Sequence, residues 1–330
     1  MSDQDRQDLD GLVFACVLDG QGGARDLDWA GITAWTHDQG VLWVHLDVES
    51  DKSRDWIQGE PGLGELVAEA ITAEETRPRS VPMRGGLLMI LRGITHIPGP
   101  EPNEMVSLRM WLSGERIITA RRWRLSAVDD VHAALQKGIG PRTSAEFLVT
   151  IAEHMAESVN PAIDELEDTI DVVETYIPEA KDSELVNELA AVRRQAIQMR
   201  RHMGPLRDAF SHLLAERIAW LGETERALLR EVREQISHHI EDLDASRERA
   251  QIAQDQLASK SRHQSQRAMY ILAVVTAMFL PLSFIAGLLG MNVGGVPGEG
   301  NPFGFAGSLA AMGMVMAIEF WLFRRIGLIP

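Results

Sequence analysis

The sequence has one cysteine, Cys16, among its 330 residues. A single thiol excludes an intramolecular disulfide framework and any metal cluster held by several cysteines. The amino terminus is polar and acidic without an apolar stretch, so we expect no signal peptide. Nucleotide-binding loops, catalytic triads and zinc-hydrolase motifs are also missing from the sequence, and each of these motifs would carry a recognisable chemistry. We therefore expect no enzyme, no catalytic residue and no bound cofactor.

Basic residues are scarce relative to acidic ones. Lys and Arg number 32 against 48 Asp and Glu, which gives a formal net charge of −16. Proteins that bind nucleic acid need a basic surface, so we expect no nucleic-acid partner. The acidic excess keeps a large domain soluble, and it is also compatible with concentrating cations near the protein.

Charge is absent altogether between Ala268 and Gly298. An uncharged apolar stretch of 18 or more residues predicts a transmembrane helix, because about 20 residues are needed to cross the hydrocarbon core. A second apolar run, Phe303–Phe323, carries one charge, Glu319. We therefore expect two membrane helices joined by a short segment rich in glycine.

The placement of Lys and Arg predicts the orientation of these two helices. Lys260, Arg262 and Arg267 precede the first apolar run, Arg324 and Arg325 follow the second, and the connecting loop has no basic residue. Positive residues stay on the cytoplasmic side. We expect a multi-pass protein of the inner (plasma) membrane, in contact with lipid, with both termini in the cytoplasm.

Short apolar runs between Gly and Asp residues predict strands in the first part of the chain. We expect strands at Leu12–Leu18, Val41–Val48, Gly86–Ile94, Met105–Leu112 and Arg116–Ala120, with a helix at Leu63–Thr72. Strand signals end at residue 125, and helical periodicity follows. It predicts helices at Ser126–Gln136, Thr143–Ile177 and Ser183–Leu214, the last two as an antiparallel hairpin.

The longest predicted element is Glu223–Leu289, in which the only Gly and Pro residues are Pro281 and Gly287. It is expected to be one helix of roughly 65 residues, or about 100 Å. The predicted organisation is an α/β cytoplasmic domain (1–125), a helical hairpin region (126–222), a stalk helix (223–268), a first membrane helix (269–292), an outer loop (293–302), a second membrane helix (303–323) and a cytoplasmic tail (324–330).

Small and polar residues follow one face of the first membrane helix. They recur at steps of three, four or seven, as Gln266, Met269, Ala273, Thr276, Ser283, Gly287 and Gly290. Such a line fits either a narrow pore or a close contact between helices. The second apolar run has its own line of small residues, Ala306, Ala310, Gly313 and Ala317, which we interpret as the face that packs against the first membrane helix.

The segment from Phe279 to Asn292, which ends in Gly290-Met291-Asn292, resembles the end of the first membrane helix in the CorA family of divalent-cation transporters. The resemblance implies a homopentameric funnel in which five copies of this helix line one pore. It also implies that Asn292 rings the outer mouth, where amide oxygens can bind a cation through its water shell. Further rings would be the hydroxyls of Thr276 and Ser283 and apolar constrictions at Met269, at Leu272 or Ala273, and at Leu280.

The loop that follows, from Val293 to Pro297, reads Val-Gly-Gly-Val-Pro and is similar to the ZntB branch of that family. This similarity implies zinc as the transported ion, with proton coupling, and other divalent ions (Mg²⁺, Co²⁺, Ni²⁺, Cd²⁺) as further substrates. Tyr270 and Gln266 also differ from the residues common in the magnesium branch. A magnesium or cobalt channel of the same family is one alternative, and a non-conducting membrane-anchored sensor or scaffold is another.

Other residues could bind or attract ions. Glu234, His238 and Asp242 lie at steps of four on the stalk helix, which fits a cytosolic metal site or simply a solvated face. His263 would lie near the cytoplasmic pore mouth. Glu299 is the one carboxylate of the outer loop and would raise the local cation concentration. Glu319 would either relay protons or pair with Arg324 or Arg325.

Overall fold

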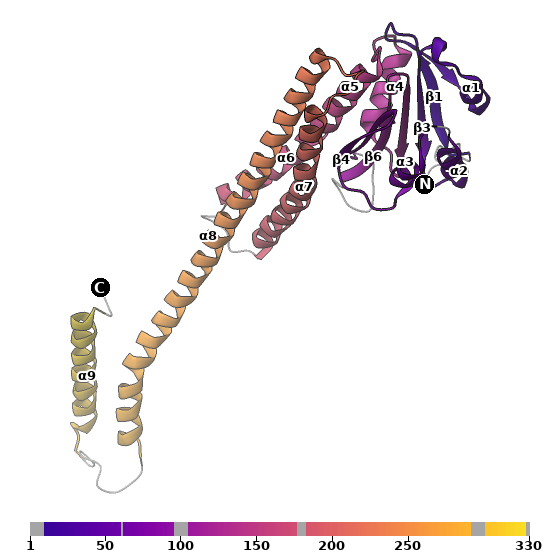
Figure 1. The fold of residues 1–330 in the computed structure, drawn as a ribbon. Helices are drawn as coiled ribbons and strands as arrows, with labels where there is room; N and C mark the ends of the chain where they lie inside the picture. Colours follow the sequence, from indigo (N-terminus) through magenta and orange to yellow (C-terminus); the bar gives the residue numbers. More distant parts are fainter. Residues whose placement is uncertain (1–9, 61, 96–104, 177–182, 292–300, 328–330) are drawn as a thin grey trace. The chain divides into compact units, whose positions relative to one another are not determined.

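A computed structural model describes residues 10–60, 62–95, 105–176, 183–291 and 301–327. By its contacts the chain divides into two compact units, Met1–Gln254 and Asp255–Pro330 (Figure 1). Helix α8, Glu223–Leu289, belongs to both units.

A seven-stranded mixed sheet with the strand order β2-β1-β3-β7-β6-β5-β4 forms the centre of the first unit. Strands β3 and β7 pair in parallel, and the other described pairs are antiparallel. The strands are β1 (Leu12–Leu18), β2 (Ala24–Leu27), β3 (Val41–Asp47), β4 (Arg79–Met83), β5 (Gly86–Ile94), β6 (Met105–Leu112) and β7 (Arg116–Arg121). The five predicted strands are confirmed. The sequence did not predict β2 and β4, which are short edge strands with charged residues or proline, as edge strands often are.

Helices cover both faces of this sheet, which explains why its central strands are largely apolar. Helices α1 (Trp29–Ala34), α2 (Asp51–Gly59) and α3 (Glu65–Thr72) share one core with the strands, in which Ile57 and Ile71 are buried with Leu46 and Ile118. A 3-10 helix, His37–Gln39, lies between α1 and β3.

The other face of the sheet is covered by α4 (Ser126–Gln136) and α5 (Ser144–Glu157). The ring of Phe147 in α5 meets that of Trp43 in β3 at a centroid distance of 4.7 Å, and the ring of His132 in α4 stacks on that of Phe14 in β1 at 3.9 Å. Both helices therefore pack on the sheet, although they follow the boundary expected at residue 125.

The single helix expected over Thr143–Ile177 is two helices. Helix α5 ends at Glu157, and α6 (Asn160–Tyr176) begins after Ser158 and Val159. Pro161 is the second residue of α6, where the lack of an amide hydrogen costs no helical bond. Thr143 caps α5 by accepting a hydrogen bond from the amide of Glu146 at 3.1 Å. Unbroken apolar periodicity concealed this break.

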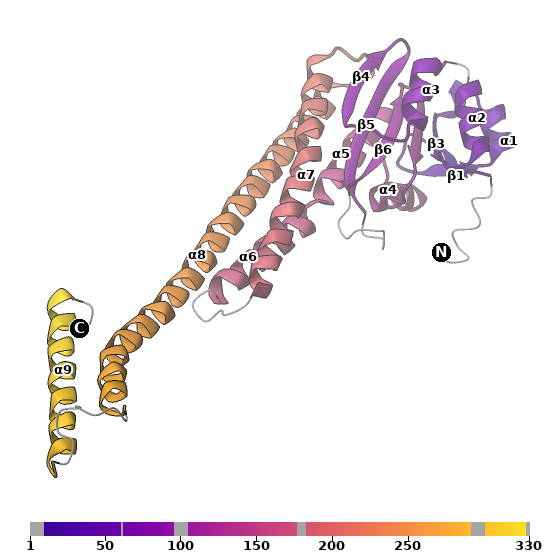
Figure 2. The same ribbon diagram turned by 90° about the horizontal axis from the view of Figure 1, so that it is seen from below.

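Helices α6, α7 (Ser183–Ala215) and α8 run side by side in the first unit (Figures 1 and 2). The predicted pairing of the two shorter helices is confirmed by the contacts between α6 and α7. Ion pairs join α8 to both helices. Arg200 of α7 pairs with Asp244 of α8 at an Nε–Oδ1 distance of 3.0 Å, and Arg249 of α8 pairs with Asp171 of α6. The predicted bounds of α8 are confirmed, since it is one helix of 67 residues.

The second unit contains the apolar end of α8 and the helix α9 (Gly304–Ile326). Both helices are long and apolar enough to cross a membrane, and the most apolar window of each has no buried residue in this chain. The small residues expected to pack against the first span, Ala306, Ala310, Gly313 and Ala317, are exposed. That face of α9 is left for lipid or for another copy of the chain, because no described part of this chain covers it.

Candidate functional site

An open groove of about 530 Å³ lies on one face of the apolar part of α8. Its lining residues recur at steps of one, three or four, as residues on one helix face do: Met269, Leu272, Ala273, Thr276, Ala277, Leu280 and Pro281. The structure therefore places the stripe residues Met269, Ala273 and Thr276 together with Leu280, which the family resemblance had implied as an apolar constriction. Met269 and Leu280 are 64% and 66% exposed, so no described residue of this chain fills the groove.

The sequence did not single out Ala277 and Pro281 as groove residues. Pro281 lies inside α8 and has no amide hydrogen, so it cannot donate to the carbonyl of Ala277 four residues earlier. Helices open or bend at such a proline, which accounts for a hollow at this position. The signal that could have identified these residues is the proline itself, within an otherwise regular apolar helix.

The polar groups on this face carry no charge. Thr276 donates its hydroxyl hydrogen to the carbonyl of Leu272 at 2.8 Å, so its oxygen keeps lone pairs that can accept hydrogen bonds from water. Gln266 and Ser283 are exposed. No atom lies within 4 Å of the place where a side chain on Gly287 would begin. The face thus offers hydrogen-bond acceptors and small surfaces, which suits the passage of a hydrated ion.

Helix α8 ends just before the Gly290-Met291-Asn292 motif. The amide of Gly290 donates to the carbonyl of Ala286 at 3.0 Å, and that of Met291 to Leu288 at 3.5 Å. Asn292 and Glu299 lie outside the described residues. The polar face of α8 therefore leads directly to the motif.

Glu319 is the one acidic residue of α9. Its Oε2 atom is shielded from solvent and has no hydrogen-bond partner among the described residues. The guanidinium group of Arg325 lies 5.2 Å from the ring centre of Trp321 instead of pairing with this carboxylate. Among residues 301–327 no ion pair joins Glu319 to Arg324 or Arg325, so the pairing that we considered is not formed here.

The predicted cytosolic metal residues do not come together in this chain. Glu234 pairs with Arg233 at 3.1 Å, and His238 lies 3.7 Å from Glu241. Asp242 and His263 join no group of three potential metal ligands in the described part of the chain. His263 instead lines an open depression of about 490 Å³ with Gln256, Ser259, Lys260, Gln264 and Arg267.

His239, the neighbour of His238 in the sequence, is buried. Its Nε2 atom lies 2.7 Å from Oδ1 of Asn160, the first residue of α6. Burial lowers the pKa of His239, which favours the neutral ring. With its hydrogen on Nε2, that ring donates to the amide oxygen of Asn160. His239 therefore holds α8 to α6 and is a structural residue.

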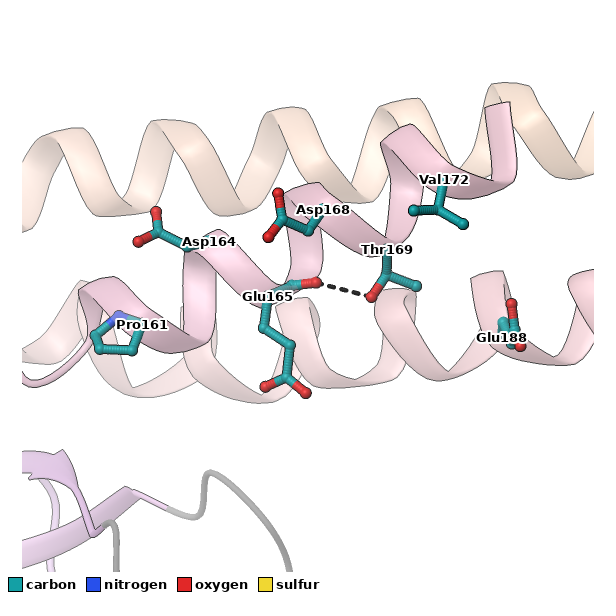
Figure 3. A pocket seen from close by; sticks show the side chains of 7 residues that line it. All are labelled: Pro161, Asp164, Glu165, Asp168, Thr169, Val172 and Glu188. Atoms are coloured by element: carbon teal, nitrogen blue, oxygen red, sulfur yellow. Dashed lines mark hydrogen bonds between the residues drawn. The ribbon is translucent and has the colours of Figure 1, made fainter. Parts of the chain in front are cut away.

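A second groove, of about 560 Å³, lies between α6 and α7 and is acidic. Figure 3 shows its lining residues, Pro161, Asp164, Glu165, Asp168, Thr169 and Val172 of α6 and Glu188 of α7. The carboxylate of Glu165 points away from those of Asp164 and Asp168. Burial and the nearby Asp242 and Asp164 raise the pKa of Glu167. This surface is strongly negative, but its carboxylates do not converge on one point.

Comparison with known proteins agrees with this architecture. Residues 38–325 match the family model described as "CorA-like Mg2+ transporter protein". The divalent cation transporter CmaX of Pseudomonas aeruginosa is 33% identical over 319 residues, which cover 96% of each chain. The zinc transport protein ZntB of Yersinia pseudotuberculosis is 32% identical over 313 residues, or 94% of each chain.

Solved structures share the fold over nearly the whole chain. The structure of full-length CmaX has a TM-score of 0.85 at 33% identity and covers 96% of this chain and 98% of its own. The CorA magnesium transporter of Methanocaldococcus jannaschii has a TM-score of 0.82 at 20% identity, with 96% and 99% covered. The chain therefore belongs to the CorA family of divalent-cation transporters, which are inner-membrane transporters and not enzymes, with two C-terminal membrane helices and a cytoplasmic N-terminal region.

Proposed function

We propose that the chain assembles as a homopentamer in which five copies of α8 enclose a pore for divalent cations, with zinc as the physiological ion. The observation that carries this proposal is the uncharged, uncovered face of α8, which begins at Gln266 and ends at Gly290. Exposing such a face does not stabilise a single chain. Five copies turned toward one axis would form a continuous wall of hydroxyls, small residues and apolar rings.

The chemistry of this wall suits an ion that keeps its water. The hydroxyls of Thr276 and Ser283 accept hydrogen bonds from first-shell water without stripping it, and an Asn292 ring does the same at the outer mouth. Glu299, one per chain, concentrates cations outside that ring. The exposed side chains of Met269 and Leu280 form apolar constrictions that control wetting.

The preference for zinc is supported by the outer loop and by the relatives. The residues from Val293 to Pro297 are similar to the zinc branch of the family, and the Yersinia relatives are named as zinc transport proteins. Magnesium is the second candidate, because the family model and the archaeal structure are named for magnesium. A non-conducting sensor or scaffold does not fit a family of transporters.

Proton coupling is supported by the position of Glu319. A carboxyl group within a membrane helix is costly in free energy, and such residues therefore usually mark an ion path or a proton relay. In this chain its Oε2 atom has no partner among the described residues. We assign Glu319 as the residue that exchanges the coupled proton.

The test is uptake into proteoliposomes, with zinc and magnesium compared in the presence and absence of an imposed pH gradient. We expect zinc uptake to exceed magnesium uptake and to depend on the gradient. Asn292→Ala should abolish the flux while the pentamer persists, and Glu319→Gln should remove only the dependence on the gradient. The matched control is Asn187→Ala, an exposed amide on α7, which should leave the flux unchanged.

Each part of the proposal can fail separately in this assay. Unchanged flux in Asn292→Ala would contradict the proposed role of Asn292 at the outer mouth of the pore. Zinc uptake that does not depend on the pH gradient would contradict proton coupling. Faster uptake of magnesium than of zinc would indicate that magnesium is the physiological ion. A molecular mass in detergent other than that of five chains would contradict the pentamer.

A further inference from the structure

The part of α8 that precedes its apolar stretch within the second unit has one side that is rich in hydrogen-bond donors. The open depression of about 490 Å³ lies on this side, and its lining residues are Gln256, Ser259, Lys260, His263, Gln264 and Arg267. Each of these six side chains can donate a hydrogen bond, and none of them is a carboxylate. A surface made of such groups favours an anion over a cation.

The charge of this segment differs from that of the whole chain. The protein has a formal net charge of −16, yet no acidic residue occurs between Gln256 and Gly298. The acidic residue that precedes this segment, Asp255, comes twelve residues before Arg267, which is about 18 Å along the helix. No carboxylate of the neighbouring turns of α8 is therefore within reach of Arg267.

The depression lies where α8 enters the membrane from the cytoplasm. Arg267 is the last charged residue before the apolar stretch, and His263 and Gln264 precede it by about 6 Å or less along the helix axis. The headgroup layer adds about 5–7 Å to each side of the hydrocarbon core, so these three residues lie at its depth. Tyr270, one turn after Arg267, is 43% exposed, as aromatic residues at a membrane–water interface are.

The depression and the groove proposed to line the pore lie on different sides of α8. Arg267 precedes Met269 by two residues, which places the two about 200° apart around the helix. Arg262 is exposed and precedes Met269 by seven residues, so it shares the side of the groove. A molecule bound in the depression is therefore not the cation in transit.

We propose that this depression binds the phosphate headgroup of an anionic phospholipid in the cytoplasmic leaflet. The planar guanidinium group of Arg267 can donate two hydrogen bonds to one phosphate, and Gln264 and His263 supply further donors. Lys260, about 10 Å farther from the membrane, adds attraction to the negative lipid surface. A zwitterionic lipid carries a cationic group beside its phosphate, which these basic side chains repel.

The test is equilibrium binding of radiolabelled phosphatidylglycerol to the full-length protein in detergent. Unlabelled phosphatidylglycerol and phosphatidylcholine with the same acyl chains serve as competitors. Phosphatidylglycerol should displace the label at a concentration about tenfold lower than phosphatidylcholine, because two basic residues favour the anionic headgroup. Equal displacement by the two lipids would overturn the proposal.

Substitutions then locate the site on the helix. Arg267→Gln and Lys260→Gln should each weaken the binding of phosphatidylglycerol about fivefold, whereas Arg262→Gln should leave it unchanged. Arg262 is the matched control, because it is a basic residue of the same helix, outside the depression, and two residues nearer the apolar stretch than Lys260. If only the charge near the bilayer mattered, Arg262→Gln would weaken binding at least as much as Lys260→Gln, and that result would overturn the site.

Inorganic phosphate distinguishes a lipid headgroup from a soluble anion. In millimolar excess it should leave the bound phosphatidylglycerol in place, since it has no acyl chains. Displacement by inorganic phosphate would assign the depression to a soluble phosphate compound and overturn the proposal for a lipid. The assay measures no flux, so its failure leaves the proposed pore intact, and failure of zinc transport leaves this site intact.

Discussion

The two units of this chain differ in where their apolar side chains lie: buried in the first unit and exposed in the second. In the first unit, a sheet with helices on both faces buries residues such as Leu46 and Trp43 completely. In the second unit, the apolar windows of α8 and α9 have no buried residue, and large side chains such as Phe284 are 66% exposed. The first unit therefore holds a core of its own, whereas the described residues of the second unit leave its apolar surface uncovered, as in a protein that lies in a membrane.

Helix α8 shows both behaviours within one element. Between Leu229 and Ala253 it buries one line of residues against α6 and α7, as amphipathic helices of soluble domains do. Between Met269 and Leu289 it is uncharged and largely apolar, with no buried residue, as a helix in a membrane is. Exposed apolar residues are expected in the second unit, because its helices are apolar enough to lie in a membrane. In the first unit, which has a core of its own, an exposed residue such as Ile252 stands out.

The strongest test of this contrast is a pair of leucine truncations. Leu46→Ala, in the core of the first unit, should lower its free energy of unfolding by about 2–5 kcal/mol, because it leaves a cavity. Leu309→Ala, in α9 with 58% of the residue exposed, should leave that unfolding unchanged. Denaturant titration in detergent, followed by tryptophan fluorescence, measures both. An equal loss in the two variants would mean that the units do not hold separate cores.

A weaker effect should appear when the pH is lowered, and it should belong to the first unit. Burial, and then the charge of Arg92, lower the pKa of His202 to about 4 from its ordinary value of 6.5. Between these two values the unfolded chain binds a proton that the folded chain does not bind. The free energy of unfolding therefore falls as the pH falls from about 6.5 toward 4.

His202→Gln should flatten this dependence, and the measurement is the denaturation midpoint at several pH values between 7 and 4. The buried His45 contributes with the same sign, since burial lowers its pKa as well, so some dependence should remain. A variant with the full slope of the parent would show that His202 does not lose its proton on folding.

The smallest effect should come from the ion pairs that join α6 to α8. Arg249 donates from Nη2 to Asp171 at 2.5 Å and to Glu174 at 2.7 Å, which raises the pKa of Arg249. Its side chain is 39% exposed, so solvent screens both pairs. Arg249→Gln should cost about 1 kcal/mol or less, and less still at high salt. Arg247→Gln, an exposed neighbour on the same helix, is the control and should cost nothing measurable.

Much of the fold was predictable because its signals are local. The bounds of β1, β5, β6, α4 and α8 agree with the sequence-based prediction, since these segments are apolar or periodic and end at Gly, Pro or polar residues. Strands β2 and β4 and helix α2 were missed. Their sequences are short and polar, and they form because a neighbouring strand or core residue is present, which no local pattern reveals.

The candidate site was predicted in part. Spacing alone placed Met269, Ala273 and Thr276 on one face, and all three line the groove. Leu280, which only the family resemblance had singled out, lines it too. The roles of Asn292 and Glu299 stay predictions, because both lie outside the described residues. The cytosolic set of Glu234, His238, Asp242 and His263 does not gather in this chain, since spacing by four shows which side chains share a face but not which ones meet.

The sequence by itself determined where the two membrane helices lie, how they are oriented and which face of the first is polar. These properties follow from length, charge and helical period, which act within a few turns of one helix. Only the tertiary structure decided that the helix predicted for Thr143–Ile177 is interrupted at Ser158 and Val159, that α4 and α5 cover the sheet, and that the side of α8 bearing Ile252 stays uncovered. These depend on contacts between segments far apart in the chain.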